Sequence, residues 1–283
     1  MMNNNLIITC ALCGSGTTKA LSPYVPITPD EIAEDAVKTV KAGASVLHIH
    51  VRDNEGNNTM ETIRFVEVVT KVRKALAKEN LDAVLNLTTS GTKFSEEMRV
   101  AHLYELLPEM CSYDPGSMNW SNSYVFLNPP SFLEKLGDVC QELEVKPECE
   151  IFDSGMLGNV NYYLKKGKLR SPVHCQLVLG IQGGMPGNVD SVAHLLPKLP
   201  EGSTWSITGI GKSHMPCMLI GLAEGCNGLR VGLEDNIFLS KGVYATNEQL
   251  VKRACELGII AGRKIAAAED TREILGLKKK VFT

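Results

Sequence analysis

Short apolar runs alternate with longer amphipathic stretches along the whole chain. The longer stretches carry apolar residues at helical spacing, whereas the short runs have the length and composition of buried strands. The runs lie at residues 6–13, 45–51, 83–89, 110–114, 147–153, 174–181, 203–210 and 228–233. The pattern therefore predicts a strand–helix unit that repeats from one end of the chain to the other.

The clearest helix is expected over residues 28–43. Thr28 is a preferred N-cap residue, Pro29 suits the first helical position, and Gly43 ends the apolar periodicity. Glu31 follows Thr28 at the spacing of a capping box. Two further helices are expected from the same kind of pattern, over residues 64–80 and 246–270.

Eight strand-like runs that alternate with helical segments are the element count of a (β/α)8 barrel, the TIM-barrel fold. The chain has 283 residues, and barrels of this kind take about 250. We therefore expect a single domain over residues 1–283. The alternative is an open doubly wound sheet, which needs a glycine-rich turn that leads directly into a helix. Residues 13–16, CGSG, lead instead into Thr-Thr-Lys and prolines.

The charge balance narrows the range of partners. The net charge is −3, with 22% charged residues, so no basic surface for nucleic acid is indicated. No apolar run approaches the ~20 residues of a membrane span. The first residues also lack the basic segment of a secretion signal. We expect neither nucleic acid nor a membrane among the partners.

The chain contains nine cysteines. Cys10 and Cys13 form a C-x-x-C pair, but no second pair follows at zinc-finger spacing. Their positions face opposite sides of a strand, so the two thiols are not expected to share a metal ion. We expect buried free thiols in a reducing compartment, and therefore a cytoplasmic protein.

Polar residues gather where the expected strands end. In a barrel, the ends of the parallel strands and the loops that follow them form the active-site face. The polar residues at these ends are His48, His50, Arg52, Asp53, Thr88, Thr89, Ser90, Asp114, Glu150, Asp153, Gln182, Arg230, Glu234 and Asp235. The sequence therefore predicts that polar side chains gather at one end of the barrel, which we call the mouth.

Two histidines on the second expected strand suggest a metal site. His48 and His50 share one strand face, because side chains alternate along a strand. Glu234 ends the last strand, which in a closed barrel lies beside the first strand and close to the second. Two histidines and one carboxylate with an open fourth position are a catalytic zinc pattern. The alternative is a pair of histidines that are satisfied by hydrogen bonds without a metal.

Arg230 precedes the adjacent acids Glu234 and Asp235 in a glycine-flanked apolar run. Buried charges need partners, and an arginine beside an aspartate favours the ionised form of that aspartate. Asp235 is therefore a candidate general base. The alternative is an exposed Glu-Asp loop.

Several stretches, taken together and in order, resemble the β-keto acid cleavage enzymes. They are LIITCALCGS at 6–15, SVLHIHVRD at 45–53, PECEIFDSGM at 147–156, LVLGIQGGMPG at 177–187, TWSITGIG at 204–211 and GLRVGLEDN at 228–236. The likeness covers essentially the whole chain. It implies a zinc-dependent (β/α)8 barrel, with a tendency to form tetramers, that lets a β-keto acid react with acetyl-CoA. The products are acetoacetate and an acyl-CoA.

The resemblance also implies roles for individual residues. The residues that match the family's zinc ligands are His48, His50 and Glu234. Asp235 resembles the general base, and Arg230 and Glu150 resemble its supporting ion network. Thr88 and Ser112 occupy positions that hold the substrate carboxylate or assist the chemistry.

Gly16 marks a departure from part of the family. Relatives that act on an amino-substituted keto acid carry an acidic residue at this position, where it can pair with the ammonium group. The glycine predicts that this chain prefers an uncharged or anionic substrate tail.

Two other classes of protein remain as alternatives. Metal hydrolases of the amidohydrolase type also place H-x-H in a barrel, but on the first strand, with further histidines at the ends of the fifth and sixth strands. Here the pair lies on the second strand, and His174 begins the sixth. A non-enzymatic binding module is the other alternative, and it needs no metal-competent group beside an arginine–aspartate pair.

Overall fold

The computed structural model of the chain describes residues 4–280, in which eight parallel strands close into a barrel. Neighbouring strands follow the chain order, and β1 pairs with β10 to close the ring. The barrel strands are β1 (Asn5–Ala11), β2 (Val46–Ile49), β3 (Val84–Leu87), β4 (Met110–Tyr113), β7 (Lys146–Ile151), β8 (His174–Leu179), β9 (Thr204–Gly209) and β10 (Gly228–Val231). The predicted (β/α)8 fold is confirmed.

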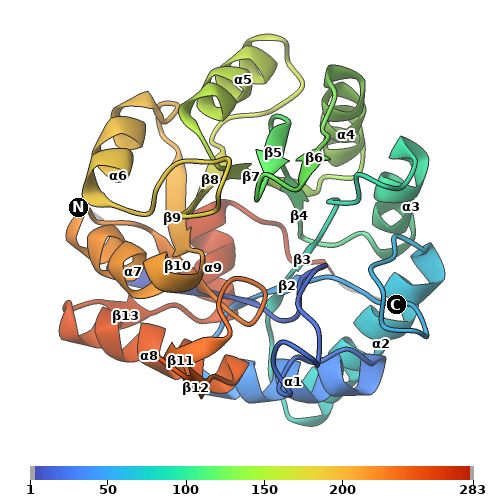
Figure 1. The fold of residues 1–283 in the computed structure, drawn as a ribbon. Coiled ribbons are helices and arrows are strands. Elements are labelled where there is room, and N and C mark those ends of the chain that lie inside the picture. Colours follow the sequence, from blue (N-terminus) through green and yellow to red (C-terminus); the bar gives the residue numbers. More distant parts are fainter. Residues whose placement is uncertain (1–3, 281–283) are drawn as a thin grey trace.

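A ring of helices surrounds the barrel (Figure 1). The apolar faces of these helices pack on the outside of the strands and form the main hydrophobic core with them. The ring consists of α1 (Pro29–Ala42), α2 (Thr62–Lys78), α3 (Glu96–Leu106), α4 (Pro130–Glu142), α5 (Ser154–Lys165), α6 (Val189–Leu195), α7 (His214–Ala223) and α8 (Asn247–Ile260), with single 3-10 turns at Leu196–Lys198 and Gly211–Ser213.

Helix α1 begins and ends as its sequence predicts. The Thr28 hydroxyl accepts a hydrogen bond from the backbone N–H of Glu31, and the Glu31 carboxylate accepts one from the backbone N–H of Thr28. Gly43 follows the last turn with a φ of 118°, which lies in the left-handed region that glycine adopts without strain. The predicted capping box is confirmed.

The strands are shorter than the apolar runs that predicted them. Strand β2 ends at Ile49, so that His50 and Arg52 already lie beyond it. Strand β10 ends at Val231, because Gly232 has a φ of 142° and lies so close to β1 that a Cβ atom would be 2.1 Å from the carbonyl oxygen of Ala11. His50, Arg52, Glu234 and Asp235 therefore belong to the loops that follow the strands, whereas His48, Glu150 and Arg230 lie within strands.

The single helix expected over residues 246–270 is wrong. Helix α8 ends at Ile260, and Gly262, with a φ of 78°, turns the chain back. The short strand β13 (Lys264–Ile265) then pairs with β1, and α9 (Ala268–Leu275) follows. The apolar periodicity of the sequence continued through the turn because it includes Ile259 and Ile260, although these side chains are 62% and 82% exposed.

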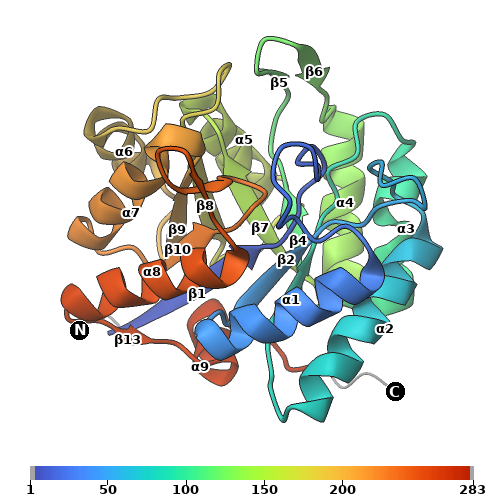
Figure 2. The ribbon, with the colours of Figure 1, turned by 60° about the horizontal axis from the view of Figure 1, so that its bottom comes forward.

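Helix α9 covers the amino ends of the strands, at the bottom of Figure 2. Arg272 is 4% exposed, and its Nε lies 2.5 Å from Oε1 of Glu109, while its Nη1 lies 2.7 Å from Oδ2 of Asp82. These contacts fix α9 to the segments that lead into β3 and β4.

Two small hairpins were missed in the sequence, because their strands are too short to show an alternating pattern. The hairpin of β5 (Met118–Trp120) and β6 (Tyr124–Phe126) stands at the opposite end of the barrel from α9 (Figure 2). The second hairpin, of β11 (Phe238–Ser240) and β12 (Val243–Tyr244), follows β10. Both hairpins therefore belong to loops that follow the carboxyl ends of barrel strands.

All nine cysteines are buried and free. Among residues 4–280, no helix is long and apolar enough to cross a bilayer.

Candidate active site

A chamber of about 550 Å³ opens at the carboxyl ends of the strands. Seven of the residues to which the sequence analysis gave a role line it, namely Gly16, His48, His50, Glu150, Arg230, Glu234 and Asp235. They come from the loop after β1 and from β2, β7 and β10, which are far apart in the sequence. Because parallel strands present their carboxyl ends together, the fold brings these side chains to one place.

The two histidines converge on Glu234. His50 Nε2 lies 3.4 Å from Glu234 Oε1, and His48 Nε2 lies 3.7 Å from Glu234 Oε2. One ligand atom from each of the three residues falls within 4.8 Å of the others. The contact follows from the strand pairing, because Ala11 of β1 is in register with His48, and β1 also pairs with β10.

This triad can hold a metal ion. The Oε2 atom of Glu234 is buried without a hydrogen-bond partner, as are the Nδ1 atoms of both histidines. Burial lowers the pKa of His48 well below its usual value, so that the imidazole is neutral, as a metal ligand must be. Burial raises the pKa of Glu234, but the adjacent His50 and Arg230 side chains outweigh it, and the net shift is downward. A neutral imidazole and a carboxylate are suitable ligands for zinc.

The loop after β1 is shaped around this triad. Gly14 has a φ of 61°, and a Cβ atom there would lie 2.6 Å from Cγ of Glu234. Arg52, from the H-x-H-x-R stretch, donates from Nη2 to the carbonyl oxygens of Gly14 at 2.7 Å and Thr17 at 2.9 Å. Arg52 therefore fixes the loop, and Gly14 leaves room for Glu234. The sequence suggested neither role, although both residues stood within the motifs.

Arg230 ties three carboxylates together beneath the triad. It is 1% exposed. Its Nε donates to Oδ2 of Asp235 at 3.0 Å, and its Nη2 donates to Oε1 of Glu234 at 2.8 Å. Its Nη1 lies 3.3 Å from Oε1 of Glu150. The guanidinium group thus holds the metal-competent carboxylate of Glu234 and the carboxylate of Asp235 in fixed relative positions.

Asp235, the candidate base, is held by a second donor besides Arg230. Thr208 Oγ1 donates to its Oδ2 at 3.1 Å. Burial raises the pKa of Asp235, and the opposing charge of Arg230 reduces this effect without reversing it. Burial also raises the pKa of Glu150, well above the usual value. The sequence had suggested that Arg230 decides the ionisation of Asp235, but the buried environment has the larger effect.

Thr88 and Ser112 lie behind the chamber wall. Thr88 Oγ1 accepts a hydrogen bond from the backbone N–H of Ser90 at 3.0 Å, and Ser112 Oγ accepts one from the backbone N–H of Thr89 at 2.9 Å. The chamber is lined instead by Ser90 and by Asp114, which are joined by a hydrogen bond of 2.6 Å. These two residues were counted among the polar strand ends, but no role was predicted for them.

The rest of the chamber is largely apolar. Trp120 packs against Phe126 and Phe152, with 5.3 Å between ring centroids in each pair. Leu21, Val178, Ile181 and Ile210 complete this wall. Gly16 lies at its edge, where a Cβ atom would meet nothing within 4 Å. The wall carries no charge to match an ionic substrate tail.

A second group of possible ligands lies deeper in the barrel. It consists of His48, Glu148 and Glu150. Glu148 is 1% exposed and accepts a hydrogen bond of 2.5 Å from Nδ2 of Asn86, and burial raises its pKa to about 7. Of these three residues, the chamber reaches His48 and Glu150 but not Glu148. The triad with Glu234 is therefore the better candidate for a metal that must contact a substrate.

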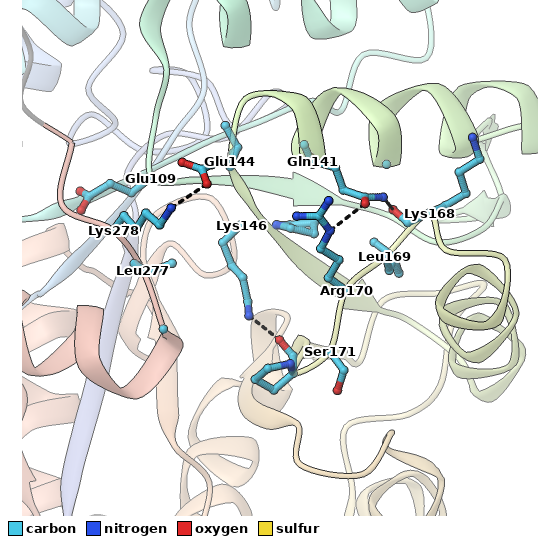
Figure 3. Close-up of a pocket in the computed structure, with 16 residues that line it drawn as sticks. Glu109, Gln141, Glu144, Lys146, Lys168, Leu169, Arg170, Ser171, Leu277 and Lys278 are labelled. Carbon is cyan, nitrogen blue, oxygen red and sulfur yellow. Dashed lines mark hydrogen bonds and ion pairs between the residues drawn. The ribbon is translucent and has the colours of Figure 1, made fainter.

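Another cavity, of about 250 Å³, lies at the amino ends of the strands. Figure 3 shows that its labelled side chains are mostly charged, and Lys278 bonds Glu144 while Arg170 bonds Gln141. Lys146, the first residue of β7, lines it. No histidine occurs among the described residues that line this cavity, and it lies at the end of the barrel away from the triad.

The amidohydrolase-type alternative lacks its additional ligands. His174 stands at the amino end of β8, where Nδ1 and Nε2 lie 2.9 Å and 3.0 Å from the hydroxyls of Thr204 and Ser206. It is therefore satisfied inside the barrel, away from the mouth.

The sequence matches the family model described as "beta-keto acid cleavage enzyme" over residues 5–277. It is 36% identical to a 3-keto-5-aminohexanoate cleavage enzyme of Fusobacterium nucleatum, over 98% of this chain and 100% of the relative. It is also 37% identical to a 3-dehydrocarnitine:acetyl-CoA trimethylamine transferase of Rhizobium meliloti, over 99% of both chains.

Solved structures agree on the fold. The chain superposes on ObcA, solved as a ternary complex with a C4-CoA adduct and oxalate, with a TM-score of 0.77. The alignment has 23% sequence identity and covers 90% of this chain and 68% of that one. At this level of identity the likeness concerns the barrel alone.

Proposed function

Because the chain belongs to the β-keto acid cleavage enzyme family, we propose that it lets a β-keto acid react with acetyl-CoA. The products are acetoacetate and the acyl-CoA of the remaining part of the substrate. Relatives named as acetyl-CoA transferases of 3-dehydrocarnitine, 3,5-dioxohexanoate and 3-oxoadipate support this reaction class. The observation that carries the proposal is the convergence of His48, His50 and Glu234 beside the Arg230–Asp235 pair.

We propose that the ion held by His48, His50 and Glu234 is zinc. When bound there, zinc supplies a Lewis acid for the negative charge that develops on the keto and carboxylate oxygens of the substrate. The triad leaves a side open toward the chamber, as a catalytic site requires.

Asp235 is the proposed general base. A β-keto acid carries acidic protons on C2, between its two carbonyl groups, and Asp235 takes one of them. Its raised pKa brings its basicity closer to neutral pH, which favours proton transfer. Arg230, with Glu150 on its far side, holds the Asp235 carboxylate in place. Glu150 and Arg230 are positioning residues in this proposal.

The remaining bonds change without a further reagent. After proton loss, C2 attacks the acetyl carbon of acetyl-CoA and the CoA thiolate leaves. The C2–C3 bond of the original substrate then breaks, and its acyl carbon joins the CoA sulfur. C2 keeps the new acetyl group and regains the proton from Asp235, so that acetoacetate leaves and the enzyme is restored.

For Thr88 and Ser112 we propose that they assist the chemistry from behind the chamber wall, by holding the backbone of the loop that carries Ser90. Each hydroxyl accepts a bond from a backbone N–H and keeps its own proton to donate. Gly16 is proposed to set the preference for an uncharged or anionic substrate tail, because the edge of the chamber at Gly16 is open and uncharged.

We also propose that the chain is one domain over residues 1–283, that it works in the cytoplasm, and that it forms a homotetramer. The buried free thiols support a reducing compartment. The tetramer rests on the family's tendency alone, and light scattering of the purified protein tests it.

The function is tested by incubating the zinc-loaded protein with acetyl-CoA and a panel of β-keto acids. We expect acetoacetate and a new acyl-CoA in equal amounts, and neither product without acetyl-CoA. Hydrolysis of a substrate in the absence of acetyl-CoA would support a metal hydrolase instead.

A further inference from the structure

A second cavity adjoins the chamber and extends the site away from the triad. Its volume is about 470 Å³, and we call it the side lobe. The two cavities share the lining residues Ser15, Gly16, Ser90, Tyr124 and Phe126. A molecule in the side lobe therefore meets a molecule in the chamber at this boundary. The proposed reaction needs two substrates whose reacting carbons touch.

The lining of the side lobe differs from that of the chamber. Among the described residues that line it, there is no carboxylate and no histidine. Its other lining residues are mostly neutral and polar, and they include Thr18, Asn57, Asn58 and Thr92. The chamber suits a metal-held keto acid with an apolar tail, whereas the side lobe suits a polar, uncharged chain.

Asn58 offers an unused acceptor in this lobe. Its Oδ1 atom is buried and has no hydrogen-bond partner. The backbone at Asn58 is fixed by a bridge to Arg52, so that the side chain starts from a defined position. An acceptor without a partner is unfavourable, so this position favours a ligand that brings an N–H group to Asn58.

Two cations lie at the side lobe without a carboxylate partner. Arg52 is 4% exposed, and among residues 4–280 its guanidinium group donates to the backbone carbonyl oxygens of Cys13, Gly14, Thr17 and Gly56. Lys93 is exposed and, among residues 4–280, has neither an ion pair nor a hydrogen bond. The outer part of the lobe is therefore positively charged, and a lysine binds phosphate as a point charge.

We propose that the side lobe holds the pantetheine arm of acetyl-CoA, with Asn58 accepting from a pantetheine amide N–H and Lys93 facing the phosphates. The inference rests on the proposed function, which supplies acetyl-CoA as the second substrate. The acetyl group then reaches the boundary at Gly16 and Ser90, next to the chamber. The keto acid keeps the chamber with its triad and apolar wall.

The test compares acetyl-CoA with acetyl-pantetheine, which lacks the phosphates and the nucleotide. With a saturating β-keto acid, Lys93→Glu is expected to raise the KM for acetyl-CoA by about tenfold or more, because a charge-assisted contact becomes a repulsion. The KM for acetyl-pantetheine, the KM for the keto acid and kcat stay unchanged. Calorimetry with acetyl-CoA alone should give the same ranking of affinities.

Lys212→Glu is the matched control. Lys212 is also exposed and lacks an ion pair within residues 4–280, but it follows β9 and lines neither cavity. The Lys212→Glu variant should keep the wild-type KM for acetyl-CoA and for acetyl-pantetheine. Asn58→Ala is expected to raise the KM for acetyl-CoA and acetyl-pantetheine alike, because both contain the amide groups.

Two outcomes would overturn the inference, and a third would overturn the proposed function alone. If Lys93→Glu changes the KM for the keto acid and not for acetyl-CoA, the side lobe holds the substrate tail. If Lys212→Glu raises the KM for acetyl-CoA more than Lys93→Glu does, the phosphates of acetyl-CoA lie near the loop that follows β9. If the wild-type protein turns over no β-keto acid yet binds acetyl-CoA as described, the proposed function fails while the lobe assignment stands.

Discussion

Arg230 and Asp235 form a buried ion pair in which Nε donates to Oδ2 at 3.0 Å, and both side chains are 2% exposed. Arg230 is held within β10, whereas Asp235 lies beyond the turn at Gly232. The pair therefore sets the direction of the carboxylate relative to the triad, and Thr208 reinforces it from β9.

Replacing Asp235 tests its role as the base. Asp235→Asn keeps the size of the side chain but cannot accept the C2 proton, so we expect turnover to fall roughly 10²–10⁴-fold. The zinc content and the circular dichroism spectrum should remain those of the wild type. Near-normal turnover in this variant would mean that the base lies elsewhere.

Arg230→Ala should also lose activity, for a different reason. It leaves the Asp235 and Glu150 carboxylates buried without their cation, and breaking such a pair costs about 3–5 kcal/mol of stability. Arg230→Lys is the milder variant, because it restores a charge but not the forked geometry. We expect it to fold and to turn over slowly. Full activity in Arg230→Lys would show that the geometry of the guanidinium group is dispensable.

Metal content tests the triad directly. His48→Ala removes one of the three ligands, so we expect the purified variant to lose bound zinc and turnover together. His174→Ala is the control, since this histidine is buried but is bonded to Thr204 and Ser206. Measured by atomic absorption, one zinc ion per chain retained in His48→Ala would contradict the assignment.

Gly16 provides a test of substrate preference. The wild type should prefer 3-oxohexanoate to 3-keto-5-aminohexanoate, because no acid meets the ammonium group at this edge of the chamber. A charge-assisted hydrogen bond contributes about 1.5–3 kcal/mol, which corresponds to about tenfold to a hundredfold in kcat/KM. Gly16→Glu should move the ratio toward the amino substrate, and the open space around Gly16 accommodates the new side chain. A wild-type preference for the amino compound would show that another residue, such as Asp114, supplies the acid.

Asp35 gives the fold a measurable dependence on pH. Burial raises the pKa of Asp35 to about 6, and the hydrogen bond from Asn247, at 2.5 Å, only partly offsets this. The folded state therefore binds the proton more tightly than the unfolded state does. The contribution of Asp35 to the free energy of unfolding is lower above pH 6 and recovers as the pH falls toward 4.

We therefore expect Asp35→Asn to be more stable than the wild type at pH 8, by at most about 3 kcal/mol. The difference should vanish near pH 4, where the wild-type carboxyl is protonated in both states. Urea unfolding at both pH values measures it. Glu256→Gln, at an exposed site on α8, should show no such trend, and a destabilised Asp35→Asn at pH 8 would contradict the argument.

Both the barrel and most of the chamber could be predicted because each rests on local patterns in the sequence. The apolar runs and the H-x-H stretch are local patterns, and closure of eight parallel strands brings β2 and β10 together without further information. Gly14 could not be found in this way, because its role is to leave room for Glu234, which is far away in the chain. The chamber wall was missed because Trp120 and Phe126 belong to a hairpin with strands too short for periodicity.

Thr88 and Ser112 illustrate a second limit. Their roles came from matching motifs alone, and residues two positions apart point to the same face of a strand, so the sequence does not decide which of them reaches the cavity. The structure places Ser90 and Asp114 on that surface. The side lobe was likewise invisible in the sequence, since Asn58 and Lys93 follow different strands and share no motif.

The pairing of β1 with both β10 and β13 has a consequence for synthesis of the chain. The first strand leaves the ribosome early, but its partners on one edge are encoded some two hundred residues later. Until they emerge, β1 and the growing sheet expose unpaired edges, which favour association with other chains. The ion pairs of Arg272 with Glu109 and Asp82 form later still. Nascent chains that stop before α9 are thus expected to need chaperones, because β1 still lacks its partner strands or α9 has yet to bind Glu109 and Asp82.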